Sequence, residues 1–156
     1  MLTANDIHQY QFLGRIIDAF VLGMISCIGI YFLFFYIPYR TDKTPLYFAL
    51  LCMMVFLRGS LVNQDFLGSF FPESAWSILL KFEYLSFYWS LYFYIGFMRS
   101  LYPQEYSSTL LRINGGFATI FSIVMLTTDT MTNSQMVTPY QIIYLGHLVV
   151  LFSLLL

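Results

Sequence analysis

Helix-length apolar runs are the feature of this sequence that most constrains its fold. A transmembrane helix needs about 20 mainly apolar residues to cross a hydrocarbon core of about 30 Å. Five stretches approach or reach that length: residues 16–37, 45–62, 76–98, 110–127 and 139–156. None shows the apolar and polar alternation over about ten residues that marks a β-barrel strand. The pattern therefore predicts an all-α integral membrane bundle of five transmembrane helices.

The composition agrees with a membrane protein. The chain is 59% hydrophobic and only 10% charged, with a mean hydropathy of +0.72, whereas soluble domains are about 25% charged. The formal net charge is -1 and no run of like charges occurs, so we expect the lipid bilayer as a partner and no nucleic acid. Because no long linker is visible, residues 1–156 are predicted to form one transmembrane domain.

The prolines mark where the predicted helices end. All five lie at or near a predicted boundary: Pro38, Pro45, Pro72, Pro103 and Pro139. Thr44–Pro45 and Thr138–Pro139 each match an N-cap residue followed by proline at the first helical position, where the missing N–H has no cost. These two pairs predict helix starts.

The basic residues in the loops predict the orientation of the bundle. Arg40 and Lys43 lie in the first loop, and Arg99 and Arg112 bracket the third. The second and fourth loops, 63–75 and 128–138, contain acidic residues but no basic ones: Asp65, Glu73 and Asp129. The positive-inside rule then puts the N-terminus outside and the first and third loops in the cytoplasm, with Arg15 as a mild exception.

The two ends of the chain carry weaker signals. Residues 1–14 have no basic n-region, so they are not a cleaved secretory signal. We expect either that the first span directs insertion itself or that further sequence once preceded it. The last apolar run continues to the final Leu156 without a polar anchor, and about 18 residues at 1.5 Å each reach only about 27 Å. The sequence therefore gives the expectation of a truncated chain.

Four charged residues lie inside or at the edge of predicted spans: Asp18, Arg58, Lys81 and Glu83. A charge at mid-bilayer costs about 2.5 to 3.5 kcal/mol on insertion scales, so such residues usually pair, face the bundle interior or snorkel. All four fall in the outer half of the predicted topology. Because a short loop joins spans 45–62 and 76–98, we expect an ion pair between Arg58 and Glu83.

Span 76–98 has two polar faces. At about 100° per residue, one carries Glu83, Ser86, Ser90 and Tyr94, and the nearly opposite one carries Lys81, Tyr84, Tyr88 and Tyr92. We expect Glu83 and the serines to hydrogen-bond a neighbouring helix or line a wet cavity, and Lys81 to reach the outer headgroups. The candidate site is therefore an intramembrane polar cluster of six residues: Arg58, Glu83, Ser86, Ser90, Asp18 and Lys81. A structural role that fixes helix register and a ligand-responsive switch both remain open.

Other residues give no sign of catalytic chemistry. His147 has no second metal ligand nearby, and Cys27 and Cys52 lie in apolar runs, where thiols usually act as small buried hydrophobes. The sequence contains no HExxH or GxSxG motif and no paired aspartates within a span, so we expect neither an enzyme nor a cofactor or metal site. Asn114-Gly115-Gly116 predicts close helix approach. Six aromatic residues are typical of a membrane-interface belt: Tyr36, Tyr39, Tyr47, Trp76, Tyr102 and Tyr140.

Several segments resemble a known membrane family. These are TPLYFALLCMMVFLRGSLVN, FFPESAWSILLKFEYLSFYWSLYFYIGFMRSLYPQEYS and MVTPYQIIYL, and the most specific parts are LRG at 57–59, KFEYLSFY and FMRSLYPQE at 97–105. From about Gly29 onward, the chain resembles the membrane core of the bacterial seven-transmembrane receptors with diverse intracellular signalling modules.

The resemblance implies a function. Such receptors carry an extracytoplasmic sensory domain before seven helices and a cytoplasmic output module, such as a histidine kinase or diguanylate cyclase, after them. The chain would then be a partial receptor core in the bacterial inner membrane that relays the signal of an unknown ligand or sensory domain. It departs from the family in having five predicted spans, no sensory domain and no output module. A small membrane transporter or channel subunit and a structural remnant without activity are the alternatives.

Overall fold

The structure is a computed structural model that describes residues 4–38, 40–62, 76–128, 141–142, 144–146 and 149. Its long helices are α1 (Ala4–Tyr36), α2 (Thr44–Val62), α4 (Trp76–Leu101) and α5 (Ser108–Thr127), and the described residues include no strand. The predicted all-α class is therefore confirmed. The predicted bounds of the second, third and fourth spans lie within three residues of the observed ones, whereas α1 begins twelve residues before the predicted 16–37 span.

Three of the described helices are long and apolar enough to cross a membrane: Phe12–Tyr36, Thr44–Leu61 and Ser108–Thr127. Helix α4 has the length, but its many tyrosine and serine residues and its charges Lys81, Glu83 and Arg99 lower its hydropathy. Most of the predicted span 139–156, including His147 and Leu156, lies outside the described residues. Three membrane-crossing helices are thus supported, and five remain a prediction.

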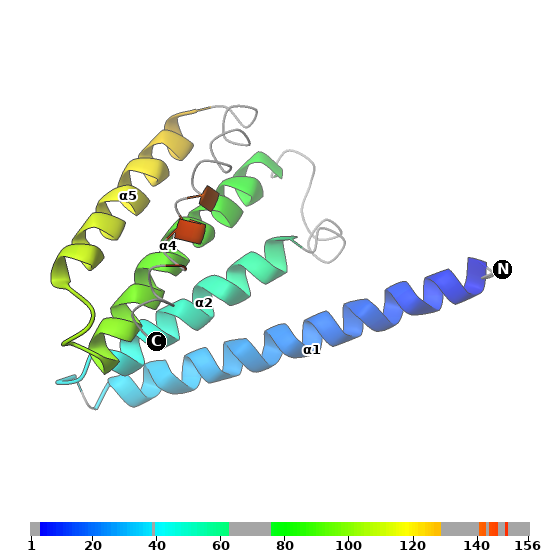
Figure 1. Ribbon diagram of the computed structural model, residues 1–156. Coiled ribbons are helices and arrows are strands. Elements are labelled where there is room, and N and C mark those ends of the chain that lie inside the picture. The colour runs from blue at the N-terminus through cyan, green and yellow to red at the C-terminus, as the bar shows by residue number, and fades with distance from the viewer. Residues whose placement is uncertain are drawn as a thin grey trace.

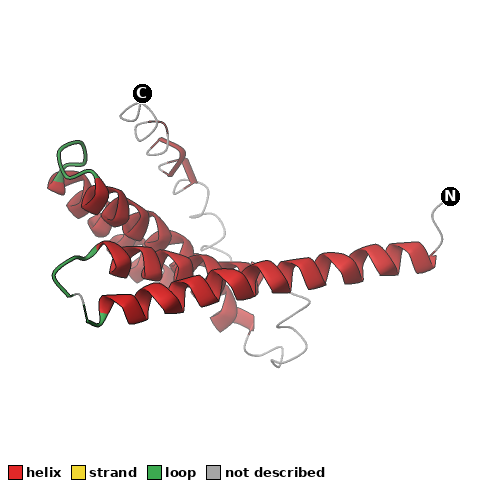
Figure 2. Cartoon of the chain, turned by 90° about the horizontal axis from the view of Figure 1, so that it is seen from below, coloured by secondary structure: helices red, strands yellow, loops and turns green. Residues whose placement is uncertain are grey.

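The helices follow one another side by side as antiparallel neighbours (Figure 1). Contacts join α1 to α2, α2 to α4, and α4 to α5. The turns after α1 and α4 therefore lie at the same end of the bundle, which gathers Arg40, Lys43, Arg99 and Arg112 toward that end. The first part of α1 projects beyond the other helices (Figures 1 and 2), and nearly all of its large apolar side chains are exposed.

Side chains just before two helices explain where those helices begin. The Asp42 carboxylate accepts hydrogen bonds from the Thr44 backbone N–H at 2.9 Å and from the Thr44 hydroxyl at 2.6 Å. The predicted helix start is right, but the acceptor is Asp42 and not the predicted N-cap Thr44. Ser107 caps α5 by accepting from the Thr109 N–H at 3.1 Å, as short polar side chains commonly do. The predicted start at Thr138–Pro139 lies outside the described residues.

Small residues let neighbouring helices approach closely. A Cβ added at Gly29 would lie 3.0 Å from the Cys52 Cβ, and one at Gly96 would lie 2.6 Å from the Tyr47 ring. Helices α1 and α2 meet at the first point, and α2 and α4 at the second. Because no side chain intervenes, a neighbouring side chain packs directly against the backbone at each glycine.

The α4–α5 contact confirms part of the prediction made for Asn114-Gly115-Gly116. A Cβ at Gly115 would lie 3.0 Å from the Tyr92 ring, so this glycine does permit close approach, whereas one at Gly116 would meet nothing within 4 Å. Asn114 is buried and donates to the Leu110 carbonyl at 2.9 Å. Only one of the two glycines therefore supports the packing of α5.

Aromatic side chains fill much of the space between the helices. Phe48 of α2 contacts Phe32 of α1, with ring centres 4.8 Å apart, and Phe97 of α4, with ring centres 5.1 Å apart. On the other side of α4, Tyr88 is 1% exposed and packs with Ala118 and Met125 of α5. These contacts fix which face of α4 meets α2 and which meets α5.

The packing revises the interpretation of Cys27 and of Tyr47. Cys27 is a free thiol on an exposed face of α1, so it is not buried within the protein as predicted, whereas Cys52 is buried. Tyr47, predicted as a belt residue, lies against Gly96 and so also serves helix packing. Tyr102 is exposed at a helix end, as a belt residue would be. Tyr39, Tyr140 and the Trp76 side chain lie outside the described residues.

Candidate functional site

An arginine and an aromatic ring connect α2 and α4 in the half of the bundle that contains the predicted polar cluster. Arg58 lies in the last part of α2, and its guanidinium carbon is 4.4 Å from the centre of the Phe87 ring. Tyr144 stacks on the same ring, with centres 5.4 Å apart and planes inclined by 29°. A guanidinium over a ring gains about 0.5 to 2 kcal/mol, more as it is desolvated. We call Arg58, Phe87 and Tyr144 the arginine–aromatic cluster.

Glu83 lies one helical turn before Phe87 and is half-buried. Arg58 attracts the Glu83 carboxylate electrostatically, so the structure brings together the two charges that the sequence predicts to be partners. The described contact of the guanidinium, however, is with the Phe87 ring. A direct hydrogen-bonded ion pair between Arg58 and Glu83 therefore remains a prediction.

The Lys81 side chain contacts the end of α5. Its Nζ donates to the Leu126 carbonyl at 3.3 Å, at the end of α5. The last carbonyls of a helix lack partners within the helix and attract cations. The lysine therefore finds an acceptor on the neighbouring helix, and its extension to the outer headgroups remains a prediction.

The serines of the predicted polar face also behave differently. The Ser86 hydroxyl donates to the Glu83 carbonyl at 2.6 Å, and the Ser90 hydroxyl donates to the Phe87 carbonyl at 2.7 Å. Both acceptors belong to α4 itself. The expectation that these hydroxyls donate to another helix is wrong, because a serine in a helix can satisfy its hydroxyl on the preceding turn.

Asp18 is exposed on α1, one turn before Leu22. Leu22 packs against Gly59 of α2, so Asp18 lies on the α1 strip that borders α2. Of the six predicted residues, Arg58 and Glu83 come together, while Lys81 faces α5 and Asp18 belongs to the surface of α1.

Phe87 and Tyr144 are the members that sequence reasoning missed. Phe87 lies four residues after Glu83 and so shares its side of the helix, a spacing that would have identified it as a neighbour of Arg58. No comparable signal points to Tyr144, because its stacking on Phe87 depends on tertiary packing and not on residue spacing within one helix.

The described residues contain no group of three histidine, cysteine, aspartate or glutamate side chains placed to hold a metal. His147 lies outside the described part of the chain. In the arginine–aromatic cluster, the positive charge of Arg58 interacts with the face of the Phe87 ring and with the nearby Glu83 carboxylate.

Taken together, the helices with membrane-crossing length and the charge held between two of them define a multi-helix membrane protein. The comparison with protein families then identifies it more closely. The model of the family described as 7TM diverse intracellular signalling matches residues 14–156. The chain belongs to this family of seven-transmembrane signalling receptors, and the predicted resemblance is confirmed. No curated protein and no solved structure matches the chain.

Proposed function

We propose that this chain relays an extracytoplasmic signal through its membrane helices to a cytoplasmic signalling module. The observation that carries the proposal is the contact between Arg58 of α2 and Phe87 of α4, with Glu83 nearby. Membership of a receptor family supports it, and the family name itself refers to intracellular signalling in relatives. The output chemistry belongs to the module, so the proposed role of this chain is not enzymatic.

The proposed mechanism is a shift between two helix arrangements. In one, the Arg58 guanidinium lies over Phe87; in the other, it moves toward the Glu83 carboxylate. A cation–π contact contributes about 0.5 to 2 kcal/mol, which is comparable to the few kcal/mol that separate two states of a responsive protein. A ligand or sensory domain that favours one arrangement would therefore change the population of both.

The proposed topology gives the relay its direction. The turn between α1 and α2 carries Arg40 and Lys43, and the ends of α4 and α5 beside their turn carry Arg99 and Arg112. These basic residues lie at one end of the bundle, and we place that end in the cytoplasm of a bacterial cell. The N-terminus would then lie outside the inner membrane. Residues 1–156 are proposed to act as a single transmembrane domain.

The direction can be tested with Gln104, which is exposed in the turn between α4 and α5. A Gln104→Cys variant should react with an impermeant thiol reagent only after the cells are opened. The unchanged chain is the blank, because Cys27 and Cys52 both lie within helices proposed to cross the membrane. Labelling of Gln104→Cys in intact cells would reverse the proposed topology.

The relay can be tested by fusing a cytoplasmic reporter enzyme after Leu156. We expect Glu83→Gln and Arg58→Gln to change the reporter activity severalfold at equal expression in the membrane. Ile120→Val is the matched control, because Ile120 is exposed on the outer face of α5. Reporter activity that is identical in all four proteins would contradict the relay. No contact among the described residues favours the transporter alternative.

A further inference from the structure

Tyr106 is buried although it lies in the turn between α4 and α5. Its side chain is 1% exposed, while its neighbours Glu105 and Ser107 are exposed. The buried Tyr106 hydroxyl has no hydrogen-bond partner among the described residues. A buried polar atom without a partner destabilises the arrangement that contains it. This destabilisation favours a second conformation of the turn, in which the hydroxyl reaches water or an acceptor.

The surroundings of Tyr106 connect this turn to α4. Burial raises the pKa of the Tyr106 phenol, and the Tyr94 hydroxyl nearby raises that pKa further. Tyr94 lies on α4 and packs against the buried Leu91, Ile95 and Leu111 group. Tyr94, the ionisable residue with the largest electrostatic effect on the buried phenol, thus belongs to the helix that also carries Glu83 and Phe87.

Tyr144 extends these contacts to the arginine–aromatic cluster. It packs against the same buried group as Tyr94, and it interacts electrostatically with both Tyr94 and Arg58. It also stacks on Phe87, over which Arg58 lies. Ring contacts therefore join Arg58, Phe87 and Tyr144, and electrostatic interactions of Tyr94 with Tyr144 and with Tyr106 extend this row to the turn.

We propose that Tyr106 is a conformational latch of the α4–α5 turn, set by the position of Arg58 through this row of aromatic side chains. The inference rests on the proposed relay. It identifies the α4–α5 turn as the element through which the signal would reach the cytoplasm. With the hydroxyl buried the latch is closed, and with the hydroxyl released the latch is open.

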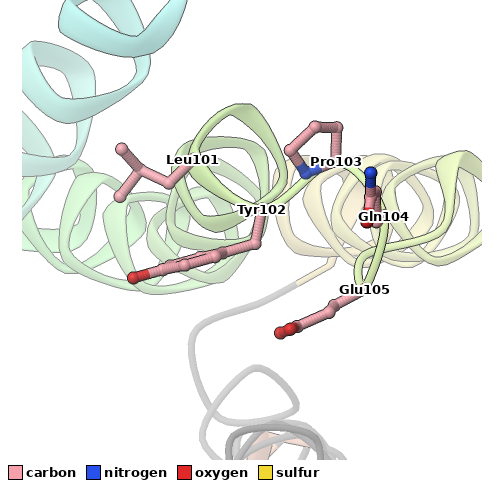
Figure 3. A pocket seen from close by; sticks show the side chains of 5 residues that line it. All are labelled: Leu101, Tyr102, Pro103, Gln104 and Glu105. Atoms are coloured by element: carbon pink, nitrogen blue, oxygen red, sulfur yellow. The ribbon is translucent and has the colours of Figure 1, made fainter.

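The turn has room for this movement. Beside it lies a cavity of about 200 Å³ lined by Leu101, Tyr102, Pro103, Gln104 and Glu105 (Figure 3). Tyr102 and Glu105 also interact electrostatically with Tyr106. The released hydroxyl can therefore meet polar groups and water at this cavity without displacement of a whole helix.

The latch can be tested by hydrogen exchange of the full chain in lipid nanodiscs. The Glu105 and Tyr106 amides report on the turn, because both donate to the Tyr102 carbonyl, at 3.3 and 3.2 Å. Tyr106→Phe keeps the ring and removes the hydroxyl without a partner, so these amides should exchange about fivefold more slowly. Tyr31→Phe, which makes the same change at an exposed tyrosine of α1, should leave the rates within about twofold.

Exchange that is unchanged or faster in Tyr106→Phe would overturn the latch, because the hydroxyl would then be neutral or already satisfied. The coupling is tested by adding Glu83→Gln. This change should alter exchange of the two amides when Tyr106 is present, and alter it much less in Tyr106→Phe. Equal effects in both backgrounds would contradict the coupling.

The relay and the Tyr106 latch can be disproved independently of each other. If Tyr106→Phe slows exchange but Glu83→Gln leaves the reporter fusion unchanged, the relay fails and the turn still has two states. If the fusion responds to Glu83→Gln while Tyr106→Phe behaves like Tyr31→Phe, the relay stands and Tyr106 is not its latch.

Discussion

The guanidinium carbon of Arg58 lies 4.4 Å from the centre of the Phe87 ring, which joins the last part of α2 to the first half of α4. The ring face holds the cation while leaving its N–H donors in the plane free to seek acceptors. A contact of this kind stabilises a pair of helices without fixing a single geometry. It is therefore suited to a position where two arrangements alternate.

Phe87→Leu should destabilise the bundle by about 0.5 to 2 kcal/mol through loss of this contact, in addition to the loss of ring packing. A double-mutant cycle with Arg58→Met, followed by unfolding in a denaturing detergent, separates the two effects. Phe82→Leu is the control, because Phe82 is an exposed residue of the same helix. A coupling energy near zero would mean that the arginine gains nothing from the ring.

Gly96→Ala should destabilise the α2–α4 contact by about 1 to 3 kcal/mol, because the new methyl group would lie 2.6 Å from the Tyr47 ring. Gly116→Ala introduces the same group where nothing lies within 4 Å, so it should be neutral or stabilising. The melting temperatures of the two variants in one detergent provide the comparison. Equal temperatures would show that α2 and α4 are not this close.

Lys81→Met should cost about 1 kcal/mol, because it removes the hydrogen bond to the Leu126 carbonyl and a cation at the end of α5. Lys43→Met changes a lysine in an exposed turn and should stay within about 0.5 kcal/mol of the unchanged chain. Thermal unfolding measures both. If the two variants lose equal stability, Lys81 does not hold α5.

The start of α2 should respond to acid. The Thr44 hydroxyl and then the Thr44 N–H donate to Asp42 and lower the pKa of its carboxyl. The folded state then binds this proton less readily than the unfolded state, whose pKa is about 3.9. The stabilisation is therefore fully present above about pH 4 and is lost as the pH falls through the lower pKa of the folded state.

Asp42→Asn should remove the part of this acid sensitivity that comes from Asp42, since an amide does not titrate in this range. Stability measured from pH 2 to 6 should fall more steeply in the unchanged chain than in the variant. Parallel curves would show that the carboxylate at the start of α2 does not contribute.

The sequence by itself determined where the helices lie, because apolar run length and proline position are local properties of the chain. It placed the starts of α2 and α4 within one residue of those observed. It missed the early start of α1, since residues 4–11 lie before the apolar segment and yet continue the helix. It also anticipated that Arg58 and Glu83 would be near each other, because helices joined by a short loop pack as antiparallel neighbours.

Tertiary structure decided what each polar side chain contacts. Lys81 donates to α5, Ser86 donates to its own helix, and Arg58 lies over Phe87. Residue spacing gives the direction of a side chain around its helix, but the partner depends on how far neighbouring helices slide and rotate against each other. That register is set by many packing contacts at once, such as Tyr47 against Gly96. No local pattern in the sequence contains it.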